Sequence, residues 1–314
     1  MEFVPIIDPA SSDAADRIDQ ACRDVGFFAV PLPTRLREMR ARLVHLAADF
    51  FARPDAEKSQ WAMARGGTAW RGWFPLDGEL TSGVPDHKEG FYFGTELPPD
   101  PRPMHGPNLW PDRPEPLREA VTSWMVEMEA LGQQLLSSMA GGLGLGHDFF
   151  RGGLTADPTC LFRIFRYPPH PGGNGGWGVG EHTDYGLLTL LATDGTPGLE
   201  VKVRNEWRPV AADADLLVCN LGDMLDRLTE GRYHSTPHRV RNHAGHDRYS
   251  LPFFLDPGWD ASVGPVEFHD DWVPPLDAAD RWDRTNLRDL HTRFATYGDY
   301  LTAKTAKVFP HLHE

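Results

Sequence analysis

The chain has 314 residues, 40% of them hydrophobic, which is enough to bury a large core in one domain or in two smaller ones. Its formal net charge is -14 and no cluster of Lys and Arg occurs, so nucleic acid and anionic membranes are poor partners. No apolar run approaches the ~18 residues of a membrane span, the N-terminus lacks signal-peptide features and the three cysteines form no C-x-x-C pair, so we expect a cytoplasmic protein with reduced thiols.

The first fifty residues predict short extended segments and two helices. Residues 4–7 and 26–30 are apolar and favour strands. The run that follows Ser11 and Ser12 has the spacing of an amphipathic helix capped by these serines. A longer helix is expected at about 34–52.

The next segment lacks periodicity. Residues 64–113 are rich in Gly, Pro and Trp, except for an extended aromatic stretch at 88–94. Stretches of this kind often cover a substrate, and the segment 70–73 is a candidate for part of a lid.

The clearest helix is expected from 114 to about 139, before Gly141 and Gly142. Apolar residues alternate along it at spacings of four and three: Leu117, Val121, Trp124, Met128, Leu131 and Leu135. This stripe should pack against a sheet.

From 160 to 256 the pattern changes to short apolar runs separated by Gly, Pro, Asn and Asp, which predicts a sandwich or barrel of many strands. A last amphipathic helix is expected at 285–309, with an apolar side of Leu287, Leu290, Phe294, Tyr297 and Leu301. We therefore expect one domain, 1–314, mainly β with flanking helices. Residues 1–113 would form an N-terminal region with lid-like segments and 160–256 the β core.

Two possible metal ligands stand two residues apart in His182-Thr183-Asp184. On an extended segment both would point to the same face, so both could bind one ion. Two imidazoles and one carboxylate suit octahedral Fe(II) and leave three adjacent positions open. A tetrahedral zinc site would use the same residue types and leave one coordination position open. Taken alone the motif is weak, because a surface histidine before a turn aspartate is commoner.

Further motifs follow in order along the chain: Asn220-x-Gly222-Asp223, Gly231-Arg232, Ser235-x-x-His238-Arg239-Val240 and Arg248-Tyr249-Ser250. Together they resemble the double-stranded β-helix (jelly-roll, cupin-like) core of the iron(II)- and 2-oxoglutarate-dependent oxygenases, in the branch that includes isopenicillin N synthase. Segments 6–30, 163–169 and 296–310 are also similar to that branch. The resemblance therefore covers nearly the whole chain.

The resemblance implies Fe(II), 2-oxoglutarate and O2 as cofactors, with His182, Asp184 and His238 as metal ligands. His238 stands in an H-R-V strand a little over fifty residues after Asp184, as in the family. Its competitors for the third position have the pattern of turn or loop residues: His234, His243 and His246. The implied reaction hydroxylates, desaturates or cyclises a small molecule such as an amino acid, peptide or secondary metabolite, and releases succinate and CO2.

Arg248 and Ser250 also stand two residues apart, so on one strand both could reach a single carboxylate. The tripeptide alone would suggest a surface ion pair, but its position after the H-R-V strand implies a site for the distal carboxylate of 2-oxoglutarate, to which Tyr167 also points in the family. Isopenicillin N synthase and the plant ethylene-forming oxidase share this pattern without using 2-oxoglutarate. A 2-oxoglutarate-independent iron oxidase is thus the alternative, and a non-catalytic or zinc-binding β-barrel is the third interpretation.

Several residues are candidates to face a substrate. Arg163 and Phe165 alternate with Tyr167, so they should face the site if Tyr167 does. A buried Arg163 needs a partner, which is either a substrate carboxylate or a protein salt bridge. Phe91 and Phe93 are further candidates, because they stand where the family places aromatic substrate walls. Phe254 is another, because its parity on the strand places it near the metal. For all three residues, packing in the core is the alternative.

The sequence also contains one misleading motif and two departures from the family's pattern. Gly173-x-Gly175-x-x-Gly178 matches a dinucleotide fingerprint only formally, because it leads into His182-x-Asp184 and not into a helix. We expect a loop there. The segment 28–33 lacks the family's Asn-His-Gly after it, and Asp226-Arg227 stands where apolar residues are frequent.

Overall fold

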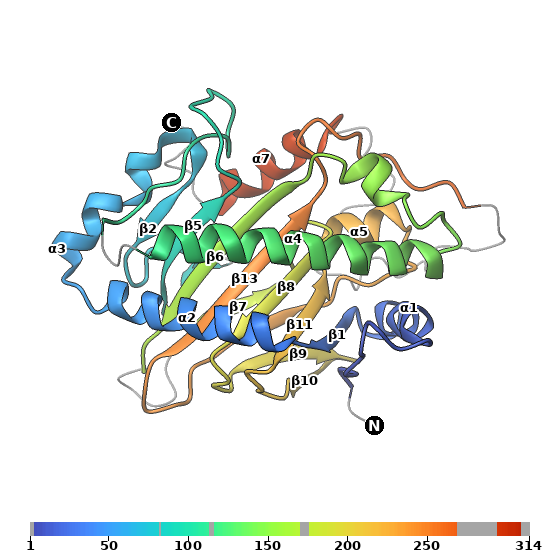
Figure 1. The fold of residues 1–314 in the computed structure, drawn as a ribbon, viewed down its shortest axis with the longest axis horizontal. Helices are drawn as coiled ribbons and strands as arrows, with labels where there is room; N and C mark the ends of the chain where they lie inside the picture. Colours follow the sequence, from blue (N-terminus) through green and yellow to red (C-terminus); the bar gives the residue numbers. More distant parts are fainter. Residues whose placement is uncertain (1–2, 82, 113–115, 170–175, 269–293, 309–314) are drawn as a thin grey trace.

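The computed structural model describes residues 3–81, 83–112, 116–169, 176–268 and 294–308. Two antiparallel sheets form its centre (Figure 1). The major sheet has the order β1 (Phe27–Pro31), β11 (Leu216–Leu221), β8 (Leu188–Thr193), β13 (Arg248–Asp256), β6 (Thr159–Tyr167), β5 (Glu89–Gly94) and β2 (Gly72–Phe74). The minor sheet has the order β10 (Glu206–Pro209), β9 (Leu199–Val203), β12 (His238–Val240) and β7 (Val179–His182). This arrangement confirms the predicted mainly β fold with a jelly-roll core.

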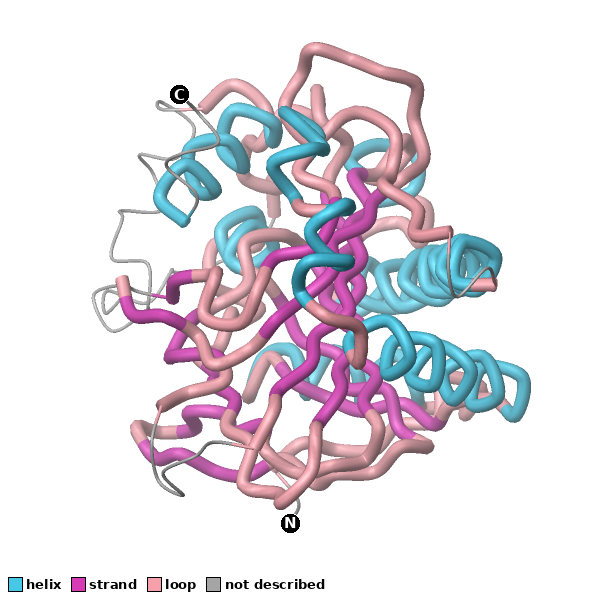
Figure 2. Tube along the Cα trace, turned by 90° about the vertical axis from the view of Figure 1, so that its left-hand side faces the viewer, coloured by secondary structure: helices cyan, strands magenta, loops and turns pink. Residues whose placement is uncertain are grey.

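Helices cover the outer face of the major sheet. Helix α4 (Leu117–Gly142) packs on β6, β8 and β13, and α2 (Thr34–Phe51) packs on α4. Figure 2 shows these two long helices side by side, on one side of the strands. The predicted apolar stripe of α4 is buried apart from Leu131, which is half-buried. At Gly132 a Cβ would lie 2.7 Å from Leu255 Cδ2, so the missing side chain lets the helix approach β13 closely.

The shorter helices lie around this body. They are α1 (Ala14–Asp24), α3 (Asp55–Lys58), α5 (Asp223–Leu228) and α7 (Tyr297–Val308). Two 3-10 segments (Ser59–Trp61 and Met63–Ala69) and a π turn (Phe150–Leu154) are the other helical elements of the described residues. Strands β3 (Leu80–Thr81) and β4 (Val84–Pro85) form a separate hairpin. Within the described part of the chain, every helix is too short or too polar to cross a bilayer.

Strand parity divides the major sheet into two faces. Phe162 and Ile164 of β6 and Phe253 and Leu255 of β13 lie fully buried on the helix side. Their neighbours along each strand point the other way, toward the minor sheet. The space between the two sheets therefore receives the alternate residues of β6, β8 and β13.

Two predictions for the N-terminal region are wrong. Residues 4–7 form no strand and only a single bridge, between Ile6 and Ala29. Helix α1 begins at Ala14 without a side-chain cap, because the Ser11 hydroxyl instead donates to the Asp8 carbonyl at 2.9 Å and closes a turn.

The segment 70–73 does not have the exposure of a lid. Trp70, Arg71 and Trp73 are all at most 4% exposed. Trp73 belongs to β2, which pairs with β5, and its indole N–H donates to Glu89 Oε2 at 2.9 Å. The segment is a buried edge of the major sheet.

The last helix starts later than predicted, at Tyr297. Thr296 and Asp299 cap it reciprocally: the Asp299 N–H donates to Thr296 Oγ1, and the Thr296 N–H donates to Asp299 Oδ2, each at 3.2 Å. Phe294 therefore precedes the helix. Leu287 and Leu290 lie outside the described residues.

Candidate active site

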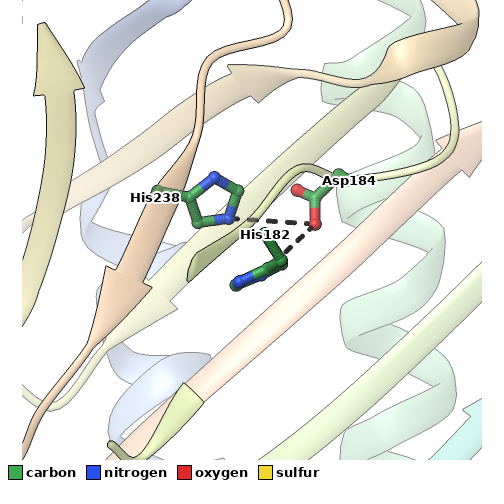
Figure 3. A group of neighbouring side chains, drawn as sticks. All are labelled: His182, Asp184 and His238. Carbon is green, nitrogen blue, oxygen red and sulfur yellow. Dashed lines mark ion pairs between the residues drawn. The ribbon is translucent and has the colours of Figure 1, made fainter. Parts of the chain in front are cut away.

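Three side chains from the minor sheet and the loop after it converge on one point (Figure 3). His182 ends β7 and is paired in register with His238, which begins β12. The Nε2 atoms of His182 and His238 lie 4.0 and 3.9 Å from Asp184 Oδ1. All three ligand atoms lie within 4.8 Å of one another, which suits one ion with bonds of about 2 Å. The structure thus brings the three predicted ligands together.

Backbone carbonyls orient both imidazoles. Nδ1 of His182 lies 2.8 Å from the Gly180 carbonyl, and Nδ1 of His238 lies 3.1 Å from the Thr236 carbonyl. Because a carbonyl oxygen can only accept, each Nδ1 must carry the proton. Each Nε2 therefore presents a lone pair on the side of Asp184, which is the tautomer that binds a metal.

Two polar side chains hold the carboxylate of Asp184. Its Oδ2 accepts hydrogen bonds from the Thr189 hydroxyl at 2.5 Å and the Asn220 amide at 2.6 Å. Thr189 and Asn220 are direct cross-strand neighbours on β8 and β11, so both reach the same oxygen. Oδ1 is left facing the two histidines, as one metal ligand.

The protonation states of the triad also suit a cation. Burial, and then the neighbouring His238, lower the pKa of His182 to about 3. Burial acts to raise the pKa of Asp184, but the two histidines and the hydrogen bonds from Thr189 and Asn220 outweigh it and lower the pKa overall. Neutral imidazoles and an ionised carboxylate are the forms that bind a metal.

Helix α5 explains why the Asn220-x-Gly222-Asp223 motif accompanies the ligands. The Asp223 N–H donates to the Asp184 carbonyl at 2.7 Å, and Asp223 Oδ1 accepts from the Ser235 hydroxyl, three residues before His238, at 2.9 Å. At Gly222 a Cβ would lie 2.4 Å from the Gly186 carbonyl oxygen, so only glycine allows the two segments to touch. One short helix therefore ties both ligand segments together.

A cavity of about 210 Å³ lies around the triad, between the two sheets. Its walls contain Thr189 and Asn220. They also contain eight residues that the sequence predicts for the site: His182, Asp184, His238, Arg163, Phe165, Tyr167, Arg248 and Ser250. Phe254 also lines it, as its parity on β13 predicts. Leu80 of the β3–β4 hairpin is 39% exposed and lines the cavity, so this hairpin and not the segment 70–73 lies at its mouth.

One part of the cavity is built for an anion. Arg248 is paired in register with Tyr167 and is 1% exposed. Its Nε donates to the Thr196 carbonyl at 3.2 Å, but Nη1 has no hydrogen-bond partner and the guanidinium no carboxylate partner among the described residues. The Ser250 and Tyr167 hydroxyls lie 3.3 Å apart beside it. A buried cation without a counter-charge is costly, so this group of residues favours a bound anion.

Phe91 and Phe93 lie in the core and not on the cavity wall, so their predicted role is corrected. In the register of β5 and β6, Phe91 is paired with Ile164 and Phe93 with Phe162, on the helix side of the sheet. Both rings are 1% exposed and stack on each other at 4.5 Å between centroids. Tyr92 between them points to the other face.

The structure also accounts for the three histidines that compete with His238 and for the acidic residue Asp226, which departs from the family's pattern. His243 and His246 are exposed loop residues, and His234 is half-buried outside the triad. Asp226 in α5 is buried, and its Oδ2 accepts from the Ser235 N–H at 2.9 Å. The unusual acid thus fixes the turn that leads to His238.

The comparisons with known proteins agree with this site. The chain matches the model of the non-haem dioxygenase in morphine synthesis N-terminal region over residues 4–113 and that of the 2OG-Fe(II) oxygenase superfamily over residues 158–257. A probable iron/ascorbate oxidoreductase of Dictyostelium discoideum is 38% identical, over 94% of this chain and 88% of that protein. A 1-aminocyclopropane-1-carboxylate oxidase of Dictyostelium mucoroides is 31% identical, over 99% of this chain and 96% of that protein. The crystal structure of a 2OG-Fe(II) oxygenase family protein from Caulobacter crescentus superimposes with a TM-score of 0.78 at 28% identity, covering 98% of this chain and 99% of that one.

Proposed function

This chain belongs to the 2OG-Fe(II) oxygenase superfamily, and from that premise we propose a role for each group of residues in its cavity. His182, Asp184 and His238 bind Fe(II). Arg248, Ser250 and Tyr167 bind the distal carboxylate of 2-oxoglutarate. The observation that carries the second assignment is the buried Arg248 guanidinium, which lacks a carboxylate partner among the described residues yet shares a cavity with the triad.

The residues of the chain position the reactants. Bound Fe(II) supplies the reaction with O2 that converts 2-oxoglutarate to succinate and CO2 and oxidises the substrate. Arg248 and Ser250 hold one end of the co-substrate, so that its 2-oxo acid end faces the triad. Gly180 and Thr236 keep the imidazoles oriented through their carbonyls. The two sheets enclose the site and limit the access of water.

The substrate is a small organic molecule that enters the same cavity and is hydroxylated, desaturated or cyclised there. Arg163, Phe165 and Phe254 face it, because all three line the cavity. An amino acid, a peptide or a secondary metabolite of specialised metabolism is the class we propose. The whole chain, 1–314, works as one oxygenase domain. The enzyme acts in the cytoplasm, where its three buried free thiols would stay reduced.

Succinate formation tests this function. Purified protein with Fe(II), 2-oxoglutarate and O2 should release succinate, and a panel of small molecules should stimulate the release. His182→Ala should abolish it, since one imidazole ligand is lost, whereas Arg208→Met on the exposed side of β10 should not.

Two outcomes would contradict the assignment. Oxygen consumption with a substrate but without succinate would favour a 2-oxoglutarate-independent oxidase, as the similarity to a 1-aminocyclopropane-1-carboxylate oxidase allows. Tight retention of zinc without oxygen consumption would favour a zinc-binding barrel.

A further inference from the structure

A second cation, Arg163, faces the cavity away from Arg248. It lies on the same strand as Tyr167 and four residues before it, which corresponds to about 13 Å along β6. The residue lines the cavity and 21% of its side-chain surface is accessible. Its guanidinium donates no hydrogen bond to any described residue, and its Nε atom is buried without a partner. This end of the cavity therefore presents guanidinium N–H donors that form no hydrogen bond with a described residue.

The acids near Arg163 are bound to other groups. Glu79 lies 3.9 Å from Arg163 Nη1, but its Oε2 lies 2.8 Å from Lys88 Nζ and its Oε1 accepts the Tyr92 hydroxyl at 2.5 Å. Asp256 accepts the Tyr297 hydroxyl at 2.6 Å and the Leu187 N–H at 3.1 Å. Neither carboxylate forms a close pair with the guanidinium. Arg163 thus has a charge partner in Glu79 at long range, but its N–H donors form no hydrogen bond with a described residue.

Aromatic rings fix the orientation of the guanidinium. Its Cζ lies 4.1 Å from the ring centroid of Tyr92 and 5.0 Å from that of Phe254. Rings that stack on a guanidinium cover its faces and leave the planar edge of N–H donors free. That edge has the geometry for a bidentate pair with a carboxylate.

The surroundings define the rest of a ligand. Tyr185 lines the same cavity as Arg163, and its hydroxyl has no hydrogen bond to a described residue. Leu161, Phe254 and Leu301 add apolar surface to the cavity wall, and Phe254 contacts Arg163 directly. The combination suits a compact molecule with one carboxylate and an apolar or aromatic body.

We propose that Arg163, assisted by the Tyr185 hydroxyl, binds a carboxylate of the substrate, so that the substrate class is small monocarboxylic acids with an apolar or aromatic body. The inference rests on the proposed function, since it concerns the same cavity. The two anion sites then have separate ligands. Arg248 anchors the co-substrate and Arg163 anchors the molecule that is oxidised.

The test compares acids with their neutral amides. Isothermal titration calorimetry would be carried out anaerobically on the full chain with Fe(II) and 2-oxoglutarate bound, using benzoate, phenylacetate and hexanoate and the three corresponding primary amides. At least one acid should bind about tenfold or more tightly than its amide, because the amide loses the charge-assisted bidentate pair. Arg163→Met should reduce the affinity for that acid to that of the amide.

The controls separate this inference from the proposed function. Arg163→Lys keeps the charge, so it should retain a weaker preference for the acid even if Arg163→Met fails to fold, and Arg208→Met should bind as the wild type does. The affinity for 2-oxoglutarate should stay unchanged in Arg163→Met. Normal 2-oxoglutarate binding with no acid bound, or with equal affinities for acid and amide, overturns the inference alone. Failure of the wild type to bind 2-oxoglutarate overturns the proposed function.

Discussion

Single side chains decide what this cavity can bind, and the sequence predicts most of them. The spacing of His182 and Asp184 and the order of the later motifs are sufficient to identify the ligands, because strand parity and chain order are visible in a sequence. The sequence does not indicate a role for Thr189, because a threonine within the apolar run of β8 looks like an ordinary strand residue. Asn220 belongs to a motif that is visible in the sequence, but its hydrogen bond to Asp184 depends on the pairing of β8 with β11.

Removal of the Thr189 hydroxyl should weaken metal binding. Thr189→Val keeps the shape of the side chain but removes one of the two donors to Asp184 Oδ2. Loss of such a supporting hydrogen bond typically costs about 10–100-fold in metal affinity. Competition with a chelator of known affinity measures the effect, with Thr122→Val on the exposed face of α4 as the control. Equal affinities in Thr189→Val and wild type would show that the hydroxyl does not support the ligand.

Asp256 should make stability depend on pH. Burial raises the pKa of its carboxyl to about 7, above the value of about 3.9 for an unfolded chain. Since the folded state holds the proton more tightly, the stabilisation is complete below about pH 4 and is lost as the pH rises through about 7. In the wild type the unfolding free energy should fall by up to about 4 kcal/mol between about pH 4 and pH 7 as Asp256 ionises. The side chain of Asp256→Asn stays neutral, so this variant should not show that decrease. Urea denaturation of the metal-free wild type and variant across this pH range measures the unfolding free energy. If that free energy changes equally with pH in both proteins, Asp256 does not cause the pH dependence.

At the scale of elements, the sequence predicts which segments are helices and strands better than how they pair. The stripe of α4 is visible in the spacing of its apolar residues. The error with Phe91 and Phe93 has a different origin, because the face they occupy depends on the register between β5 and β6. The sequence does not predict helix α5, since its six residues are too few to show a period. Its start at Asp223 depends on contacts with the Asp184 loop.

The contact between the α5 start and the metal loop should not tolerate a side chain. A Cβ in Gly222→Ala would meet three backbone atoms of Gly186 within 2.8 Å, so one of the two segments must move. We expect the unfolding free energy to fall by about 1–3 kcal/mol and metal affinity to fall with it. Gly146→Ala is the matched control, because a Cβ there meets nothing within 4 Å. Urea denaturation and metal titration of both variants test the effect. Similar stabilities for the two variants would mean that the close approach is unimportant.

At the scale of the whole molecule, two sheets and two long helices produce a chamber that contains the His182, Asp184 and His238 triad and the two cations Arg163 and Arg248. The jelly-roll core was predictable, because many short strands in sequence with ordered motifs leave few alternatives. The position of the hairpin β3–β4 at the cavity mouth was not, since its short strands carry almost no sequence pattern. Under the proposed assignments, the co-substrate binds near Arg248 and the substrate near Arg163.

Calorimetric titration of 2-oxoglutarate, without substrate and without O2, tests the central assignment most directly. In the wild type we expect one Fe(II) and one 2-oxoglutarate per chain, with co-substrate binding that depends on the metal. Arg248→Met should raise the Kd for 2-oxoglutarate about 100-fold, because its distal carboxylate loses a buried charge-assisted pair. Asp184→Ala should lose both the metal and the co-substrate. Binding of 2-oxoglutarate that is unaffected by Arg248→Met, or that persists without a metal, would contradict the account.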